Sequence, residues 1–326
     1  MPLALVLHGT GGRLGNRLML QAHLMSFCLE HSGWRLLNMN FVPYAHLFEE
    51  SRYHPWMIYP PGSRPAGPIV RMITPPGIVL ADLRKRLPDK WAYLLSIHGT
   101  RLTYRLLGRR ARLLEWGDGQ RVDLGSAEFV EWAHRFTWIV PGGFLFRDWP
   151  GLEKHQEAIR RFLRPATRYA GPAEALVADL RQRYRVVVGV LVRRTDYAWW
   201  IDGRFHFDLA QYREWLVQMV RIFGPDAGLL IAADDPEAAS IIEGLPAHLS
   251  TGAAGTAGHY MESVAALSLC DAIASPPSTF AAMAAFLGGV PILPLQDRGQ
   301  ELRRSDLLLR HLFDAVRHPE FGRAVS

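Results

Sequence analysis

Apolar and polar positions follow two different periods along the chain, and the second half shows the clearer rhythm. Short apolar runs, typical of strands buried on both faces, alternate there with longer segments of helical period. The predicted strands of this half lie at 186–192, 228–232, 272–274 and 290–293. The predicted helices lie at 173–184, 208–223, 236–243, 260–269 and 278–287. Strands that alternate with helices predict an α/β fold with a doubly wound parallel sheet.

The first half carries the same kind of pattern in a less regular form. The apolar run from Leu3 to Leu7 predicts a buried strand, and a glycine turn and a helical pattern beginning near Leu14 follow it. Further strands are predicted at 34–39 and 136–140, and further helices at 81–97, 99–112 and 152–163. The segment 60–77 is rich in proline and glycine and is expected to be a loop.

The length of 326 residues fits two domains, each large enough to bury a core. Pro165, Gly171 and Pro172 mark the best boundary, so we expect an N-terminal domain at 1–166 and a C-terminal domain at 167–326. The composition, 49% hydrophobic and 21% charged, excludes a disordered chain. Two cysteines within apolar patterns exclude a disulfide framework and indicate a reducing compartment, so we expect a cytoplasmic protein.

The net charge is +6, and nearly all of the basic residues are arginines. The arginines are scattered and form no basic stripe interleaved with aromatic residues, so we expect no nucleic-acid partner. A mild positive charge suits a phosphate ligand or peripheral contact with an anionic membrane. No apolar run reaches the roughly 18 residues of a membrane span, and the N-terminus is interpreted as a strand and not as a signal peptide.

The candidate chemistry lies where predicted strands end, because ligands of parallel sheets bind beyond the carboxyl ends of the strands. The first such place is the glycine turn before the first helix, whose backbone N–H groups could hold an anion. A dinucleotide site would need an acidic residue at the end of the second strand, where this chain has Asn38 and Asn40. A tight turn without a ligand is the other interpretation.

Two adjacent arginines, Arg193 and Arg194, follow the apolar strand 186–192. Because side chains alternate along a strand, we expect the two guanidinium groups to face opposite ways. One could then bind a phosphate or carboxylate bidentately while the other pairs locally, with Asp196 as a candidate partner. An internal ion-pair network without a ligand would explain the same residues.

Two further strand ends carry polar groups. Asp235 precedes Pro236 and is expected to cap a helix, which leaves Asp234 as the better ligand candidate. Ser278 and Thr279 begin a predicted helix, where hydroxyl and N–H groups suit a diphosphate. The sequence shows no histidine, cysteine or carboxylate spacing typical of a metal site, so we expect a ligand held by arginines and helix N-termini without metal or cofactor.

Taken in order, these segments resemble elements of the fucosyltransferase superfamily, which includes α-1,2-, α-1,6- and protein O-fucosyltransferases, and they come closest to the α-1,2 branch. The segment Gly12–Arg17 is similar to the family's Gly-x-x-Gly-Asn-Gln element, and Leu191–Tyr197 to its His-x-Arg-Arg-x-Asp signature. Asp234–Glu237 resembles an acidic element, Ser278–Phe280 the Ser-Thr-Phe element of the α-1,2 branch, and Gly143–Arg147 a Gly-Tyr-x-Gln stretch. Leu191 stands where the family has histidine.

The resemblance implies a GT-B fold, in which two Rossmann-like domains face each other across a cleft. It implies a metal-independent, inverting transfer of fucose from GDP-fucose, held by the C-terminal domain, to a hydroxyl of a glycan acceptor held by the N-terminal domain. Arg193 would stabilise the leaving diphosphate, and His8 or Asp196 would serve the acceptor or orient the arginine. The implied donor-binding residues are Gly12, Gly15, Asn16, Arg194, Asp234, Ser278, Thr279 and Phe280.

Three other classes of protein remain open from the sequence. A nucleotide-sugar-binding protein without catalysis, or with another donor, would keep the Arg193 region, and Leu191 fits that hypothesis. A dinucleotide-dependent oxidoreductase would use only the glycine turn. A structural two-domain protein would leave the polar residues at the strand ends unexplained.

Overall fold

The computed structural model describes residues 3–6, 14–50, 57–61, 111–114, 122–136, 138–141 and 146–308. The chain divides into two compact units between Ala166 and Thr167. This division falls inside the segment 164–172, where proline and glycine predict a domain boundary. Each unit contains its own five-stranded sheet with helices, which confirms the α/β class.

The sheet of the second unit is parallel throughout and has the strand order β10-β9-β8-β11-β12. Its strands are β8 (Val186–Val192), β9 (Ala227–Ala233), β10 (Ala247–Leu249), β11 (Ala272–Ser275) and β12 (Ile292–Pro294). The register pairs all of β8 with β9, from Val186 opposite Ala227 to Val192 opposite Ala233. The two longest strands in the described part of the chain therefore form the centre of this sheet.

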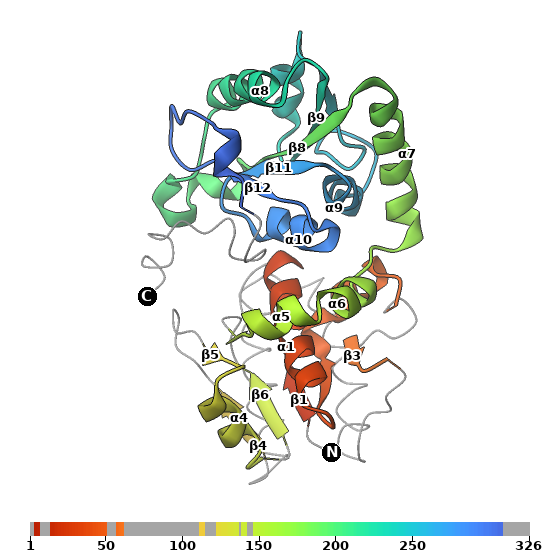
Figure 1. The fold of residues 1–326 in the computed structure, drawn as a ribbon, viewed down its shortest axis with the longest axis vertical. Helices are drawn as coiled ribbons and strands as arrows, with labels where there is room; N and C mark the ends of the chain where they lie inside the picture. The colour runs from red at the N-terminus through yellow and green to blue at the C-terminus, as the bar shows by residue number, and fades with distance from the viewer. Residues whose placement is uncertain are drawn as a thin grey trace. The chain divides into compact units, whose positions relative to one another are not determined.

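Helices cover both faces of this sheet (Figure 1), as the apolar strands require. On one face Val188, Val190 and Val192 share a core with the aromatic residues of α8 (Leu209–Phe223). On the other face Val187 packs with residues of α7 (Thr167–Arg183) and α9 (Tyr260–Ser268). Alternate residues of one strand thus belong to different cores.

The strand order places a topological switch point between β8 and β11. From β8 the chain proceeds outward through β9 and β10, and it then returns to form β11 and β12 on the other side of β8. The carboxyl ends of β8 and β11 are therefore neighbours, and α10 (Thr279–Gly288) begins just after β11. Ligands of open parallel sheets bind at such a point.

The ends of the helices in this unit have local causes. The Asp208 carboxylate accepts from the N–H of Gln211 and caps α8, which ends at Gly224 with a φ of 98°. Ser278 caps α10, and Gly289 ends it in the left-handed conformation with a φ of 65°. These caps are visible in the sequence, which explains why the predicted bounds of both helices lie within a residue or two of the observed ones.

The first unit has the strand order β3-β2-β1-β6-β4. Its strands are β1 (Leu3–Val6), β2 (Arg35–Asn38), β3 (Met57–Tyr59), β4 (Ala111–Leu114) and β6 (Trp138–Pro141), and a separate parallel pair consists of β5 (Val122–Asp123) and β7 (Phe146–Arg147). Edge strand β3 runs antiparallel to β2. The other pairings in the five-stranded sheet are parallel.

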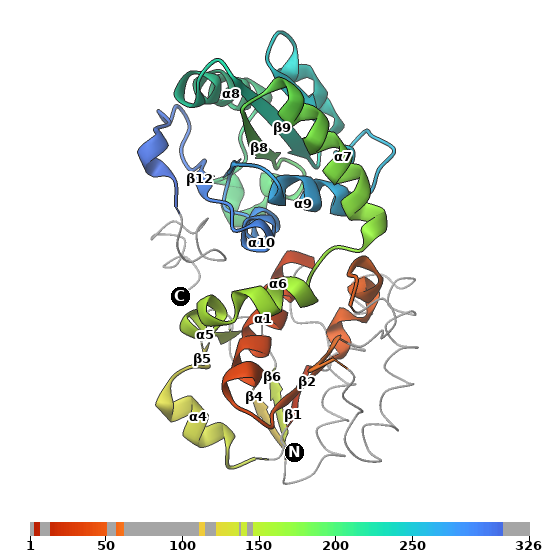
Figure 2. The ribbon, with the colours of Figure 1, turned by 45° about the vertical axis from the view of Figure 1, so that its right-hand side comes forward.

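Helix α1 (Leu14–Glu30) is almost completely buried in the first unit. It packs against β2 and against α5 (Trp149–Lys154) and α6 (Gln156–Phe162), which lie beside it in Figure 2. The described residues of this unit also form the 3-10 helix η1 (Met39–Leu47) and the helix α4 (Ala127–Ala133).

Several predicted elements differ from the structure. Residues 111–112, placed at the end of a predicted helix, belong to β4, and the predicted helix 152–163 is divided at His155 into α5 and α6. The segment Pro236–Ile242 is a 3-10 helix, and the short strand β10 was not predicted. The predicted helix 81–97 lies outside the described residues. No helix in the described part of the chain is long and apolar enough to cross a bilayer.

Candidate functional site

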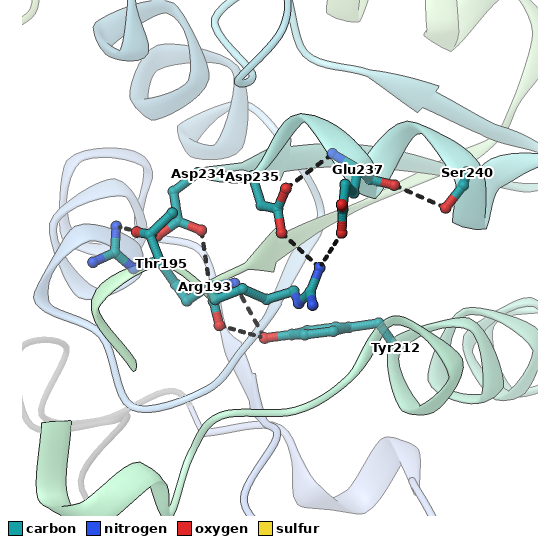
Figure 3. A network of polar contacts seen from close by, with 8 residues as sticks. Arg193, Thr195, Tyr212, Asp234, Asp235, Glu237 and Ser240 are labelled. Carbon is teal, nitrogen blue, oxygen red and sulfur yellow. Dashed lines mark hydrogen bonds and ion pairs between the residues drawn. The ribbon is translucent and has the colours of Figure 1, made fainter. Parts of the chain in front are cut away.

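The backbone at the exit of β8 is held by a tyrosine from α8. The N–H of Arg193 donates to the Tyr212 hydroxyl at 3.1 Å, and that hydroxyl lies 3.3 Å from the Arg193 carbonyl, to which it can donate. Tyr212 is completely buried, and burial raises the pKa of its phenol, which therefore stays protonated. This contact fixes the point at which the arginine pair leaves the sheet, and Figure 3 shows it.

The Arg193 guanidinium lies between two carboxylates. Its Nη2 donates to Oδ1 of Asp196 at 2.6 Å, and its Nη1 lies 3.2 Å from Oδ2 of Asp234. Its carbon atom Cζ lies 5.1 Å from the centre of the Tyr197 ring. Only 16% of the Arg193 side chain is exposed, so these ion pairs are partly shielded from water. Burial raises the pKa of Tyr197 to about 12.

Arg194 reaches a different pair of acidic side chains. Its Nη1 donates to Asp235 at 2.6 Å and to Glu237 at 3.2 Å, and its backbone N–H donates to Asp234 at 2.9 Å. The two guanidinium groups therefore have separate carboxylate partners, although both residues contact Asp234. Figure 3 shows Tyr212 on one side of the Arg193 main chain and the acidic residues on the other.

Asp234 joins three consecutive residues at the exit of β8. Its carboxylate accepts hydrogen bonds from the Arg194 N–H and from the Thr195 hydroxyl, the latter at 2.7 Å. The same carboxylate forms an ion pair with the Arg193 guanidinium. The next residue, Asp235, accepts from the Glu237 N–H at 2.9 Å and caps the 3-10 helix η5 (Pro236–Ile242). The prediction that Asp235 is a cap is confirmed, and the ligand role of Asp234 stays a prediction.

Both arginines have carboxylate partners in this structure. That one guanidinium binds an anion while the other pairs locally stays a prediction. The internal ion-pair network, the alternative interpretation, is thus present. Each arginine still has a buried Nε without a hydrogen-bond partner. A guanidinium has five N–H donors, so each arginine keeps N–H donors that the ion-pair network does not use.

The carboxyl end of β11 lies next to this network. The Tyr197 hydroxyl donates to the carbonyl of Pro277, the residue just before Ser278. The Ser278 hydroxyl accepts from the Phe280 N–H at 3.2 Å and caps α10. Ser278 is buried, whereas Thr279 and Phe280 are half-buried. Tyr197 thereby links the Arg193 side of the switch point to the start of α10.

The remaining predicted site residues belong to the first unit. Gly15 and Asn16 lie in the first turn of α1, where Gly15 is buried and Asn16 is half-buried. His8 and Gly12 lie outside the described residues. The structure therefore brings together Arg193, Arg194, Asp196, Asp234 and Ser278 within one unit, with Thr279 and Phe280 beside Ser278.

Sequence reasoning missed two tyrosines and a threonine. Tyr212, Tyr197 and Thr195 each contact the arginine–carboxylate network or its backbone. Tyr197 and Thr195 lie inside the segment that carries the resemblance, so their positions could have been questioned from the sequence. Tyr212 lies on another element, and only the fold reveals its contact. Among the described residues, no group of three or more histidine, cysteine or acidic side chains could hold a metal ion.

No model of a protein family matches this sequence, and no curated protein sequence matches it. Solved structures show distant likenesses. FUT1 from Arabidopsis thaliana in complex with GDP is 14% identical, with 94% of this chain and 73% of that chain covered and a TM-score of 0.49. POFUT1 in complex with GDP is also 14% identical, with 91% and 99% covered and a TM-score of 0.48. The fucosyltransferase NodZ from Bradyrhizobium is 14% identical, with 90% and 96% covered and a TM-score of 0.47.

Proposed function

We propose that this protein is a glycosyltransferase of the fucosyltransferase superfamily, which transfers fucose from GDP-fucose to a hydroxyl of a glycan without a metal ion. The observation that carries the proposal is the position of Arg193. A partly buried guanidinium at the end of β8 lies next to the start of α10, at the switch point of a parallel sheet. Both groups belong to segments that resemble the family's elements.

In this proposal Arg193 and the start of α10 stabilise the diphosphate leaving group. As the acceptor oxygen bonds to the sugar carbon, the bond from that carbon to the diphosphate breaks and negative charge develops on the phosphate oxygens. A fixed cation and the N–H groups of a helix N-terminus stabilise such charge without reorganisation. Arg193 supplies the cation, and the first turn of α10 supplies N–H groups beside Ser278. Inversion follows from a single displacement at the sugar carbon.

The carboxylates around Arg193 orient its guanidinium in this proposal. Asp196 and Asp234 occupy donors on Nη2 and Nη1, which fixes the plane of the group. The remaining donors are left for the phosphate oxygens. The proton of the acceptor hydroxyl passes to a carboxylate of the site, with Asp196 as the candidate in this unit.

Ligand-induced stabilisation tests the donor assignment. GDP at 100 times its dissociation constant should stabilise the protein by about 2.7 kcal/mol, and the chelator EDTA should leave this effect unchanged because no metal bridges the phosphates. The melting temperature, measured with and without GDP and with and without EDTA, checks both statements. An unchanged melting temperature at saturating GDP would show that the donor assignment is wrong.

The role of Arg193 has its own test. Arg193→Ala should lower the rate of transfer from GDP-fucose on the order of 10²–10³-fold, because one preorganised charge contact is lost. Arg193→Lys should restore little, since an ammonium cannot replace the bidentate fork. Arg298→Ala is the matched control, because Arg298 also pairs with an aspartate but 60% of its side chain is exposed.

Two outcomes would contradict this role. A folded Arg193→Ala protein with near-wild-type turnover would remove Arg193 from the reaction. An Arg193→Ala protein that does not fold would instead show that the ion-pair network is mainly structural, because unpaired buried charges are strongly destabilising. Binding of GDP-fucose without any turnover by the wild type would favour a nucleotide-sugar-binding protein.

A further inference from the structure

Trp199 is an exposed indole close in sequence to the arginine–carboxylate network. Its exposed fraction is 73%, whereas those of the other exposed large hydrophobic residues among the described ones, Tyr260, Leu269 and Leu308, lie between 38% and 40%. Single exposed hydrophobic residues are common, but an indole with this exposed fraction forgoes most of the stabilisation that burial gives an aromatic side chain.

The chain on both sides of Trp199 is firmly packed. Trp200 contacts the rings of Tyr197 and Phe205, with centroid distances of 4.9 Å and 5.8 Å. Tyr197 and Phe205 belong to the core on the α8 face of the sheet. The Arg193 guanidinium lies over the same Tyr197 ring. The segment that carries Trp199 is therefore connected to the candidate site through a continuous stack of side chains.

The backbone after Trp199 is strained. Ile201 and Asp202 have φ values of 48° and 52°, and Gly203 follows with a φ of 73°. The left-handed region is unfavourable for any residue with a Cβ, and above all for a β-branched residue such as Ile201. Hydrogen bonds from Arg204 to the Ile201 carbonyl and from His206 to the Gly203 carbonyl hold this conformation. Strain of this kind concentrates at functional sites.

The exposed residues close to Trp199 in the chain suit a sugar ligand. The other exposed residues of the segment are polar or small, namely Thr195, Ala198, Asp202 and Arg204. A pyranose ring has an apolar face of C–H groups, which packs on an indole, and a rim of hydroxyl groups, which bonds to hydroxyl, carboxylate and guanidinium groups. A protein or membrane interface would need a larger contiguous apolar patch than one indole provides.

We propose that Trp199 is a stacking platform for a pyranose ring of the acceptor glycan. This inference rests on the proposed function, which supplies the glycosyl transfer. It adds a side chain that favours acceptors with a pyranose ring. The packed neighbour Trp200 anchors the backbone that carries Trp199, so little backbone freedom is lost when the ring binds. Trp199 is a specificity residue in this proposal and takes no part in proton transfer.

The test measures oligosaccharide binding to the GDP-loaded protein. Lactose, cellotetraose and chitotetraose serve as neutral pyranose probes, and saturation-transfer NMR with titration gives their dissociation constants. We expect at least one probe to bind the wild type, and Trp199→Ala to raise its dissociation constant about tenfold or more. Trp199→Phe should retain most of the affinity, because an aromatic face remains. Leu269→Ala, at another exposed hydrophobic residue of this unit, should change nothing.

The same samples separate this inference from the proposed function. The GDP-induced shift in melting temperature should be equal in all four proteins, because the proposal assigns Trp199 to the acceptor and not to the donor. Failure of GDP to bind would overturn the proposed function, and a Trp199-dependent sugar affinity would still support the platform. Equal probe affinity in wild type and Trp199→Ala, or no probe binding to a protein that binds GDP, would overturn the platform. Loss in Trp199→Ala of a dimer, or of sedimentation with phosphatidylglycerol vesicles, would overturn it too.

Discussion

Arg193 owes its position to groups from several parts of the chain. Tyr212 of α8 accepts a hydrogen bond from the Arg193 backbone N–H. The Arg193 guanidinium pairs with Asp234, which follows β9, and with Asp196, three residues further along the chain. A guanidinium held in this way loses most of its rotational freedom. Preorganised charge is what makes a cation effective toward a developing anion.

Leu191 is the residue at which this chain departs from the family signature that it resembles, and it is buried with an exposed fraction of 3%. It lies on the same face of β8 as Gly189, since side chains alternate along a strand. A Cβ at Gly189 would point at Leu267 of α9. Leu191 thus belongs to the face opposite the α8 core.

Leu191→His is expected to have two opposite effects. A buried imidazole without a partner should destabilise the ligand-free protein by about 1–3 kcal/mol. A new donor at the diphosphate should strengthen GDP binding by roughly 1.5–3 kcal/mol, the contribution of one charge-assisted hydrogen bond. Calorimetric titration with GDP and the melting temperature without it check the two effects.

Val190→His is the control for this substitution, because Val190 is equally buried but belongs to the core on the α8 face. It should destabilise the protein without any gain in GDP affinity. If Leu191→His weakens GDP binding, the donor pocket is built around leucine for another nucleotide sugar, and the GDP-fucose assignment fails.

At the scale of elements, α9 and α10 approach each other closely at one glycine. A Cβ at Gly288 would lie 1.9 Å from the Ser268 carbonyl oxygen, which is backbone and cannot move aside cheaply. Gly288 therefore permits the contact that carries α10, and with it the Ser278 cap, to its place beside α9. Helix packing in this unit thus bears directly on the candidate site.

Gly288→Ala should destabilise the protein by about 1–3 kcal/mol, the usual cost of overpacking a well-packed contact. Gly171→Ala is the matched control, since Gly171 lies inside α7 and a Cβ there would meet no atom within 4 Å. That variant should be stabilised by about 0.4–1 kcal/mol, because alanine has less freedom in the unfolded chain. Urea unfolding of both variants gives the values, and a neutral Gly288→Ala would contradict the close approach of α9 and α10.

At the scale of the whole molecule, the two units have separate cores and should respond differently to acid. His23 of α1 is completely buried in the first unit, and its Nδ1 accepts from the Asp148 N–H at 3.0 Å. Burial, together with the charge of Arg147, lowers the pKa of His23 well below its usual value of about 6.5. The histidines of the second unit with lowered pKa values, His248 and His259, are only half-buried.

The folded first unit therefore prefers neutral His23, whereas the unfolded chain binds a proton as the pH falls through about 6.5. The stability that neutral His23 contributes is complete above that pH and is lost as the pH falls below it. Scanning calorimetry at pH 7.5 and 5.5 should show a larger loss for the first unit than for the second. His23→Gln should reduce this difference, and an unchanged difference would assign the acid sensitivity to other groups.

Much of the second unit could be predicted from its sequence, because its signals are local. Buried parallel strands appear as apolar runs, and the caps Asp208 and Ser278 stand at the residues where helices begin. The first unit was predicted less completely. Its strands β4 and β5 are short, and β3 lies at a sheet edge, so their sequences carry little periodic signal.

The sequence by itself determined the α/β class and the polar residues that follow β8, β9 and β11. Only the tertiary structure decided that β11 lies beside β8, which brings Ser278 to Tyr197 and the Arg193 network. It also decided that both arginines are paired and that Tyr212 supports one of them. The physical reason is that helix caps and apolar runs act over a few residues, whereas strand order and ion-pair partners depend on contacts between segments far apart in the chain.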